Sequence, residues 1–142
     1  MADVTSEIET MENRYMRAWA QRDLSELKSL TGGNFQLLVG SKPAVMLDRP
    51  SWIEAATTRF TCSGYRFGDI YVRDLGRAAL FASQLELKAS LDRHEWSGLF
   101  WVADLWRKGR VRRRWRLVER VLSRVDDDAT ARSAIRSMQL WK

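Results

Sequence analysis

The sequence is poor in the residues that build covalent or metal-linked folds. Among 142 residues it has one cysteine, Cys62, and one histidine, His94. A lone cysteine excludes an intrachain disulfide and a thiolate metal cluster, and it suits a reducing cytoplasm. No glycine-rich phosphate loop, nucleophile elbow or metal-ligand spacing occurs either. We therefore expect a cytoplasmic protein that uses neither a metal nor a cofactor.

Long apolar runs are also missing. Acidic residues interrupt the N-terminal segment at Asp3, Glu7, Glu9 and Glu12, so we expect no signal peptide. No stretch approaches the ~20 apolar residues that a membrane span needs. We therefore expect no membrane association.

Aromatic side chains and positive charge are what the sequence has in excess. Seven tryptophans and five phenylalanines indicate a bulky core, a lined cavity or an apolar interface. The net charge is +6, and residues 107–124 carry nine Arg or Lys against Glu119 alone. The whole positive excess therefore lies on one short segment.

Hydrophobic periodicity predicts three helices before a sheet. They span residues 5–21, a segment opened by Asp23 and stopped by the glycine pair at 32–33, and a segment from Asp48 to about Arg59. A short strand at 35–39 and a return strand at 44–47 lie between the second and third helices. These helices and strands come before any long strand.

Four long strands are predicted from residue 65 onward. They span residues 65–75, 78–91, 94–107 and 112–125, and a last helix follows to about Trp141 with Ala131, Ile135 and Met138 as its buried edge. Helices followed by long antiparallel strands predict an α+β fold with helices on one face of a curved sheet. We expect a single domain over residues 1–142, with its core at about 5–126 and a C-terminal helix at 127–142.

Asp104 lies in an apolar strand that leads through a turn at Gly109 to Trp115. A buried carboxylate without a partner is costly, so Asp104 needs a physical reason. Two are open: a neutral acid in an apolar site, or an ion pair with an arginine such as Arg116 or Arg120.

The sequence resembles the nuclear transport factor 2-like superfamily, which includes ketosteroid isomerase, scytalone dehydratase and the SnoaL-like cyclases. The resemblance rests on Arg14-Tyr15 followed by Asp23-Leu24, on the turn Val39-Gly40-Ser41, and on Asp104-Leu-Trp106 leading to Trp115-Arg-Leu-Val118. It implies a cone of helices over a bent sheet and a homodimer formed through the sheet face. It also implies a pocket for a small apolar organic ligand.

By this resemblance Tyr15 and Asp104 match the two hydrogen-bond donors of the isomerase's oxyanion hole. The isomerase's catalytic base has no counterpart, because the matching segment, 35–39, holds no carboxylate. His94 is the most attractive substitute base, although a solvated histidine after the Asp92-Arg93 turn is the simpler interpretation. Tyr15, Asp104 and His94 are thus the candidate catalytic residues.

Apolar residues on the expected inner faces are the candidate ligand contacts. They are Trp19, Leu38, Trp52, Phe100, Val102 and Trp106. Core packing or a dimer interface would explain the same tryptophans.

The arginine run has two interpretations. Seven of the ten residues from 107 to 116 are Arg or Lys, which suits nucleic acid or an acidic partner. No nucleic-acid-binding motif accompanies the run, so an exposed solubilising hairpin tip is favoured and nucleic acid is not the expected partner.

Three functions follow in order of preference. The first is a small-molecule pocket protein, as an isomerase, cyclase or dehydratase without a cofactor if it is catalytic. The second is a non-catalytic ligand-binding or dimerisation module, and the third is a binder that uses its basic hairpin. Whether the protein is an enzyme stays open at this point.

Overall fold

The computed structural model describes residues 3–125 and 128–141. Its helices are α1 (Val4–Ala20), α2 (Leu24–Leu30), α3 (Arg49–Thr58) and α4 (Ala129–Met138). Its strands are β1 (Thr31–Gly40), β2 (Val45–Asp48), β3 (Phe60–Asp74), β4 (Ala78–Leu91), β5 (His94–Glu95), β6 (Gly98–Lys108) and β7 (Trp115–Arg124). The predicted α+β class is confirmed.

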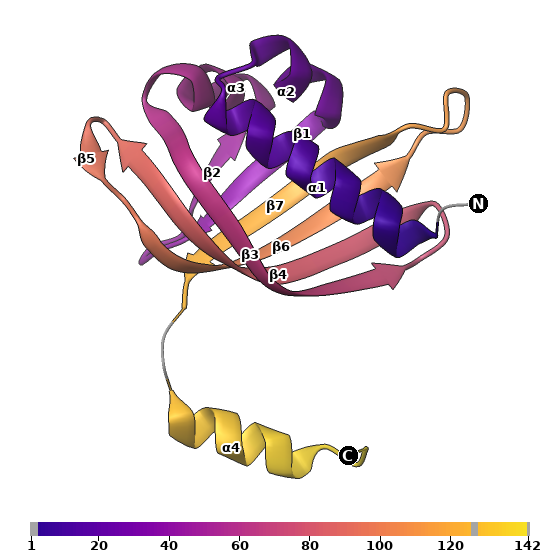
Figure 1. The fold of residues 1–142 in the computed structure, drawn as a ribbon, viewed down its shortest axis with the longest axis vertical. Helices are drawn as coiled ribbons and strands as arrows, with labels where there is room; N and C mark the ends of the chain where they lie inside the picture. Colours follow the sequence, from indigo (N-terminus) through magenta and orange to yellow (C-terminus); the bar gives the residue numbers. More distant parts are fainter. Residues whose placement is uncertain (1–2, 126–127, 142) are drawn as a thin grey trace.

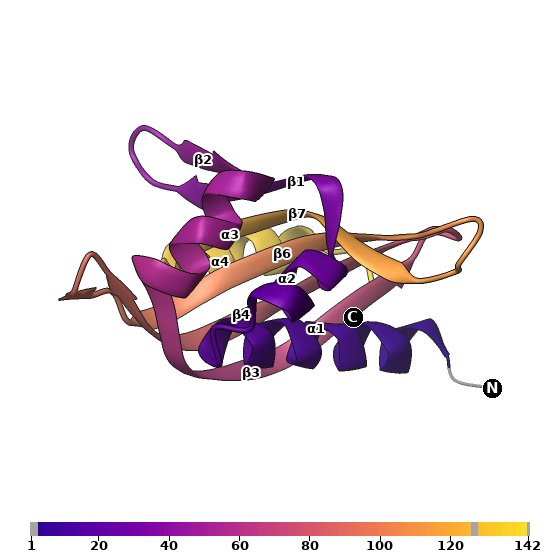
Figure 2. The same ribbon diagram turned by 90° about the horizontal axis from the view of Figure 1, so that it is seen from above.

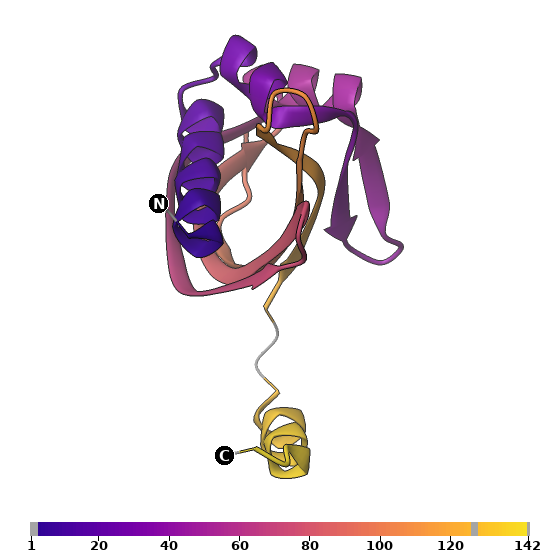
Figure 3. The ribbon, with the colours of Figure 1, turned by 90° about the vertical axis from the view of Figure 1, so that its right-hand side faces the viewer.

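The strands form one curved sheet in the order β2-β1-β7-β6-β4-β3, with β5 paired to β4. The pair β1–β7 is parallel, and the other pairs are antiparallel. The sheet curls around α1, while α2 and α3 lie across one end of the curve (Figures 1 and 3). Seen from above, α1 runs beside β3 and the β1–β2 hairpin stands at the opposite edge (Figure 2). This arrangement is the predicted cone.

Aspartates begin the second and third helices, as the sequence predicts. The Asp23 carboxylate accepts a hydrogen bond from the Glu26 N–H at 3.1 Å. Asp48 accepts from the Ser51 N–H at 3.0 Å, and Pro50 follows in the first turn. Each cap satisfies a backbone donor that the helix leaves free. None of the helices among the described residues is both long and apolar enough to cross a bilayer.

Cross-strand register separates the two faces of the sheet. The inner row faces the helices and consists of Val72, Phe81, Asp104, Arg120, Leu37 and Leu47. The next row, on the opposite face, consists of Tyr71, Ala82, Ala103, Val121, Leu38 and Met46. We call it the outer apolar row. Directly paired residues point to the same side of a sheet, so these rows define its inner and outer faces.

Two strands begin earlier than predicted. The strand expected at 35–39 is β1 from Thr31, so the glycine pair at 32–33 lies in β1 and α2 already ends at Leu30. The strand expected at 65–75 is β3 from Phe60. It starts directly after α3 because the Phe60 ring packs between Trp19 and Trp52.

Two other strands are shorter than predicted. The strand expected at 94–107 breaks after β5, where Trp96 turns to pack on Phe100 at 4.6 Å and Gly98 takes a positive φ of 145°. The strand expected at 112–125 begins at Trp115, because Arg113 has φ 48° and residues 109–114 form the hairpin loop. A left-handed residue interrupts regular pairing.

Helix α4 lies apart from the cone, beyond the end of β7 (Figure 1). The prediction that Ala131, Ile135 and Met138 are buried is wrong, because α4 has no buried residue. The described part of the extension expected at 127–142 is a helix without a packing surface; residues 127 and 142 lie outside the described residues.

Candidate functional site

A buried ionic cluster occupies the inner face of the sheet where it meets α1. Arg120 donates from Nε to Asp104 Oδ1 at 2.8 Å and from Nη2 to Asp104 Oδ2 at 2.7 Å. Both residues are direct cross-strand partners, and both are at most 1% exposed. A two-pronged contact of this kind is the strongest geometry for an arginine and a carboxylate.

Helix α1 supplies a second acid to the same guanidinium. Glu12 accepts from Arg120 Nη2 at 2.9 Å through Oε2, and from the Trp106 indole N–H at 2.8 Å through Oε1. Arg120 Nη1 contacts the Met16 sulfur at 3.2 Å. The cluster of Glu12, Asp104, Trp106 and Arg120 therefore fastens α1 to the two central strands.

The charges of this cluster balance only if one acid holds a proton. Burial raises the pKa of Glu12 well above its ordinary value, and the neighbouring Asp104 charge raises it further, although Arg120 and Trp106 act to lower it. Burial alone would lower the pKa of Arg120, but Asp104 and Glu12 hold that pKa above its ordinary value. We infer a charged Arg120 that both acids contact, in surroundings that favour the protonated form of Glu12.

Tyr15 lies on the other side of the guanidinium. The Arg120 Cζ atom stands 4.5 Å from the centre of the Tyr15 ring. The Tyr15 hydroxyl and the Trp52 indole N–H are both buried without a well-formed hydrogen bond among the described residues, although the two groups lie near enough for Trp52 to act on the pKa of Tyr15. The two rings stack at 6.5 Å with 14° between their planes. Burial raises the pKa of Tyr15, so its hydroxyl keeps its proton.

Aromatic rings close the rest of the interior. Trp19 meets Trp52 edge to face at 5.1 Å, and Phe60 lies 5.3 Å from Trp19 and 5.4 Å from Trp52. The Trp19 indole N–H donates to the Phe60 carbonyl at 2.8 Å. Such contacts add to the free energy gained by burying the rings. The indole N–H of Trp19 therefore has a hydrogen-bond acceptor, whereas the indole N–H of Trp52 has none among the described residues.

The structure brings most of the predicted site residues together. Phe100, Val102, Asp104 and Trp106 are fully buried on the inner face of β6. Tyr15 and Asp104 meet, but through the guanidinium of Arg120 rather than at a shared ligand oxygen. Of the two interpretations of Asp104, the geometry therefore favours the ion pair with Arg120.

Two predicted residues lie away from this interior. His94 is exposed on β5. Leu38 belongs to the outer apolar row, because alternation on β1 turns Leu37 and not Leu38 toward the helices. The structure thus separates both from Tyr15 and Asp104.

Glu12 is the important residue that sequence reasoning missed. It follows Ile8 by four residues and precedes Met16 by four, so it occupies the apolar stripe of α1. An acid in such a stripe predicts a buried partner. Glu12 is thus an acid within an apolar helix stripe, just as Asp104 is an acid within an apolar strand.

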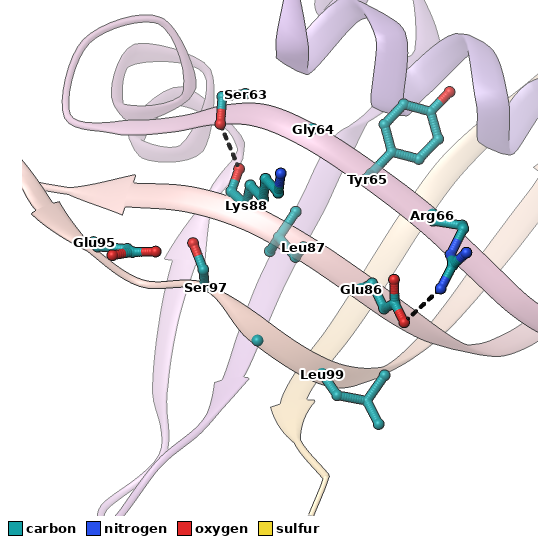
Figure 4. Close-up of a pocket in the computed structure, with 11 residues that line it drawn as sticks. Ser63, Gly64, Tyr65, Arg66, Glu86, Leu87, Lys88, Glu95, Ser97 and Leu99 are labelled. Atoms are coloured by element: carbon teal, nitrogen blue, oxygen red, sulfur yellow. Dashed lines mark hydrogen bonds and ion pairs between the residues drawn. The ribbon is translucent and has the colours of Figure 1, made fainter.

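The largest described cleft lies on the outer face of the sheet and not in the cone. It measures about 810 Å³ and lies between β3, β4 and the start of β6 (Figure 4). An ion pair at 2.8 Å joins Arg66 and Glu86 within it, and Leu99 lines its other side. None of the nine predicted site residues lines this cleft. Within the described ranges, no group of three or more His, Cys, Asp or Glu side chains is placed to hold a metal ion.

No protein-family model and no curated protein matches the chain. Solved structures do match it over most of its length. An NTF2-like protein from Cytophaga hutchinsonii superposes with a TM-score of 0.79 at 13% identity, covering 87% of this chain and 100% of that one. The S. rosetta CaMKII hub superposes with a TM-score of 0.71 at 14% sequence identity, covering 87% of this chain and 98% of that one. A ketosteroid isomerase-like protein from Erwinia carotovora atroseptica superposes with a TM-score of 0.63 at 15% sequence identity, covering 84% of this chain and 95% of that one.

Proposed function

Because the chain has the nuclear transport factor 2-like (NTF2-like) fold, we propose that it is a self-associating module whose outer sheet face binds a second copy. The observation that carries the proposal is the outer apolar row. It crosses all six strands of the main sheet path without a charged side chain. Large exposed apolar patches mark interaction surfaces.

The exposure of this face supports the proposal. Met46 and Tyr71, at the two ends of the outer apolar row, are 58% and 54% exposed. Trp101 stands beside the row on β6 and is 43% exposed. Aromatic and methionine side chains are enriched in protein interfaces. Burying them against a second copy would remove these apolar groups from water.

A second copy is the occupant that suits this face. A two-fold interface pairs a surface with itself, so an uncharged row meets an equally uncharged row without like-charge repulsion. Similarity to a protein named as a hub is consistent with self-association. The buried cluster serves stability in this proposal, because Arg120 already engages both oxygens of Asp104.

Sedimentation velocity over a range of protein concentrations tests the proposal. We expect a reversible dimer at micromolar concentrations, and we expect Trp101→Glu to weaken it about tenfold or more by burying a charge at the interface. Val111→Glu is the matched control, because Val111 is 95% exposed on the hairpin loop, away from the row. A monomeric wild-type chain, or equal weakening by both variants, would contradict the proposal.

The unpartnered donors of Tyr15 and Trp52 favour a second candidate. A buried O–H and N–H without an acceptor are costly, so a ligand oxygen that reached both would satisfy them. The aromatic rings packed around Trp52 would have to move apart to admit it. In a catalytic form, the same donors would stabilise that oxygen as it gains charge, in isomerase, cyclase or dehydratase chemistry.

Thermal-shift measurements with small ketones and phenols test this second candidate. We expect a ligand that stabilises the wild-type chain to stabilise Tyr15→Phe much less, because the variant lacks the hydroxyl. Trp19→Phe is the control, since the Trp19 N–H already has an acceptor. Equal ligand-induced shifts in the wild-type chain and Tyr15→Phe would remove the candidate.

A further inference from the structure

We propose that the cleft between the β6–β7 hairpin and the start of β1 binds a small ligand that carries adjacent phosphate groups. The cleft measures about 470 Å³. Its lining residues are Gly32, Gly33, Asn34, Arg107, Gly109, Arg110, Val111, Arg112, Arg114, Arg116 and Val118. We call it the arginine cleft. The proposal does not depend on self-association or on the interior of the cone.

An irregularity in the β1–β7 pairing forms the floor of the arginine cleft. Thr31 pairs with Leu117 and Gln36 pairs with Glu119, so residues 32–35 stand opposite Val118 alone. Such bulges bend a strand and leave residues out of the regular ladder. At Gly33 a Cβ atom would meet nothing within 4 Å. The main chain is therefore open to a ligand at this point.

Five arginines form the wall of the arginine cleft, and two of them oppose each other directly. Arg107 and Arg116 are cross-strand partners, and like charges in that position destabilise a sheet. Arg114 is held by a hydrogen bond from Nη2 to Ser29 Oγ at 2.8 Å. An anion between the opposed guanidinium groups would turn their repulsion into two attractive contacts.

The chain does not supply that anion. Two exposed arginines elsewhere do pair with carboxylates, Arg59 with Asp92 at 2.6 Å and Arg66 with Glu86 at 2.8 Å. In the part of the chain that the structure describes, none of the five cleft arginines forms an ion pair, and no Asp or Glu lines the cleft. Five arginines without a carboxylate therefore line one cleft, and this concentration of unpaired positive charge favours an anionic ligand.

The shape and chemistry of the arginine cleft favour a small phosphate ligand. Its volume falls within the ~300–1,000 Å³ typical of small-molecule sites. Guanidinium groups bind phosphate oxygens in pairs, and several of them together suit adjacent phosphates. No aromatic ring lines the cleft, so bases of a single-stranded nucleic acid have nothing to stack on. Duplex DNA and anionic lipid are the alternative phosphate-bearing ligands, and the binding experiment must distinguish them from a small phosphate ligand.

Isothermal titration calorimetry of the full chain with inorganic triphosphate tests the proposal. We expect saturable binding at low ionic strength that weakens as salt rises. Arg112→Ser with Arg116→Ser should weaken it about tenfold or more, because each lost contact is a charge-assisted hydrogen bond. The control, Arg17→Ser with Arg136→Ser, removes the same charge from surfaces outside the cleft and should leave affinity within about twofold.

Three results would overturn the proposal. The first is the absence of triphosphate binding by the folded wild-type chain at low salt. The second is an equal loss of affinity in the cleft variant and in its control, which would show binding to net charge alone. The third is tighter binding of duplex DNA or of anionic phospholipid vesicles than of triphosphate at equal phosphate concentration. Circular dichroism of both variants establishes that they are folded.

Discussion

The indole N–H of Trp106 on β6 donates a hydrogen bond to the Glu12 carboxyl on α1 at 2.8 Å, across 94 positions of the sequence. Arg120 on β7 contacts the other oxygen of the same carboxyl at 2.9 Å. Apolar packing alone would allow α1 to slide along the sheet. These directional contacts at a buried position fix its register, because any slip would leave buried polar groups unpaired.

Arg120→Met should be among the most destabilising substitutions in the chain. It removes the cation that faces Asp104 and Glu12 while both acids stay buried, and breaking a buried pair in this way costs about 3–5 kcal/mol. Urea unfolding followed by tryptophan fluorescence measures the loss. Arg116→Met, on the same strand but exposed, should change the free energy of unfolding by less than about 0.5 kcal/mol. Equal losses in both variants would contradict the structural role of Arg120.

Glu12→Gln should change the pH dependence of stability and cost about 1–3 kcal/mol, because the amide nitrogen cannot accept one of the two hydrogen bonds that Trp106 and Arg120 donate to Glu12. Glu12 has a folded-state pKa well above its ordinary 4.5, so between these two pKa values the folded chain holds one more proton than the unfolded chain. The contribution of Glu12 to the free energy of unfolding is therefore complete below its pKa in the unfolded chain, and it is lost as the pH rises through its pKa in the folded chain. The free energy of unfolding should fall by up to about 1.4 kcal/mol per pH unit in that window.

Urea unfolding at successive pH values from about 5 to about 8 measures this effect of Glu12. The exposed carboxyls Asp48, Glu86 and Asp92 have lowered pKa values and are already ionised there, and the raised pKa values of Cys62 and Tyr15 lie above the range. In Glu12→Gln the slope should vanish, since glutamine does not titrate. A wild-type stability that rises with pH in this range would show that Glu12 is ionised in the fold.

Tyr15→Phe should leave stability unchanged within about 0.5 kcal/mol or raise it, because the buried hydroxyl has no partner among the described residues and its removal abolishes a desolvation cost. Trp19→Phe is the contrasting variant, since it deletes a hydrogen bond to the Phe60 carbonyl and part of a packed ring. It should cost about 1–3 kcal/mol. Thermal and urea unfolding measure both. A loss above about 1 kcal/mol in Tyr15→Phe would reveal an acceptor for its hydroxyl.

Truncation after Val125 should leave the cone as stable as in the full chain, within about 0.5 kcal/mol, because α4 buries no residue. Arg124→Ala tests the end of β7 instead. The Arg124 guanidinium stacks 4.8 Å from the Phe100 ring centre and donates to the Ser97 carbonyl at 3.1 Å, so its loss should cost about 1–2 kcal/mol. Urea unfolding of monomeric protein compares them. A large loss on truncation would mean that α4 does pack on the cone.

Much of the fold follows from local pattern. Strand β4 matches the predicted 78–91, because the alternation of polar and apolar residues from Gln84 to Ser90 leaves one register. The breaks of the sheet were not predictable in the same way. Trp96 leaves the strand direction to meet Phe100, and that contact depends on tertiary packing that alternation does not record.

The buried site was predictable in part. Asp104 was recognisable as an acid in an apolar strand, and Arg120 was one of its two possible partners. The partner of Asp104 depends on the register between β6 and β7. A register shift between Leu105 and Trp106 places Asp104 opposite Arg120. One irregular residue in β6 or β7 changes every later pairing, and no local signal in the sequence determines where it occurs.

The parallel pairing of β1 with β7 has a consequence for synthesis on the ribosome. At about 5–20 residues per second, β1 emerges several seconds before the strand that must lie beside it. Until then, Glu12 lacks its ion-pair partner Arg120. The unpaired edge of β1 can also pair with the wrong strand. The nascent chain therefore cannot complete this sheet until β7 leaves the exit tunnel.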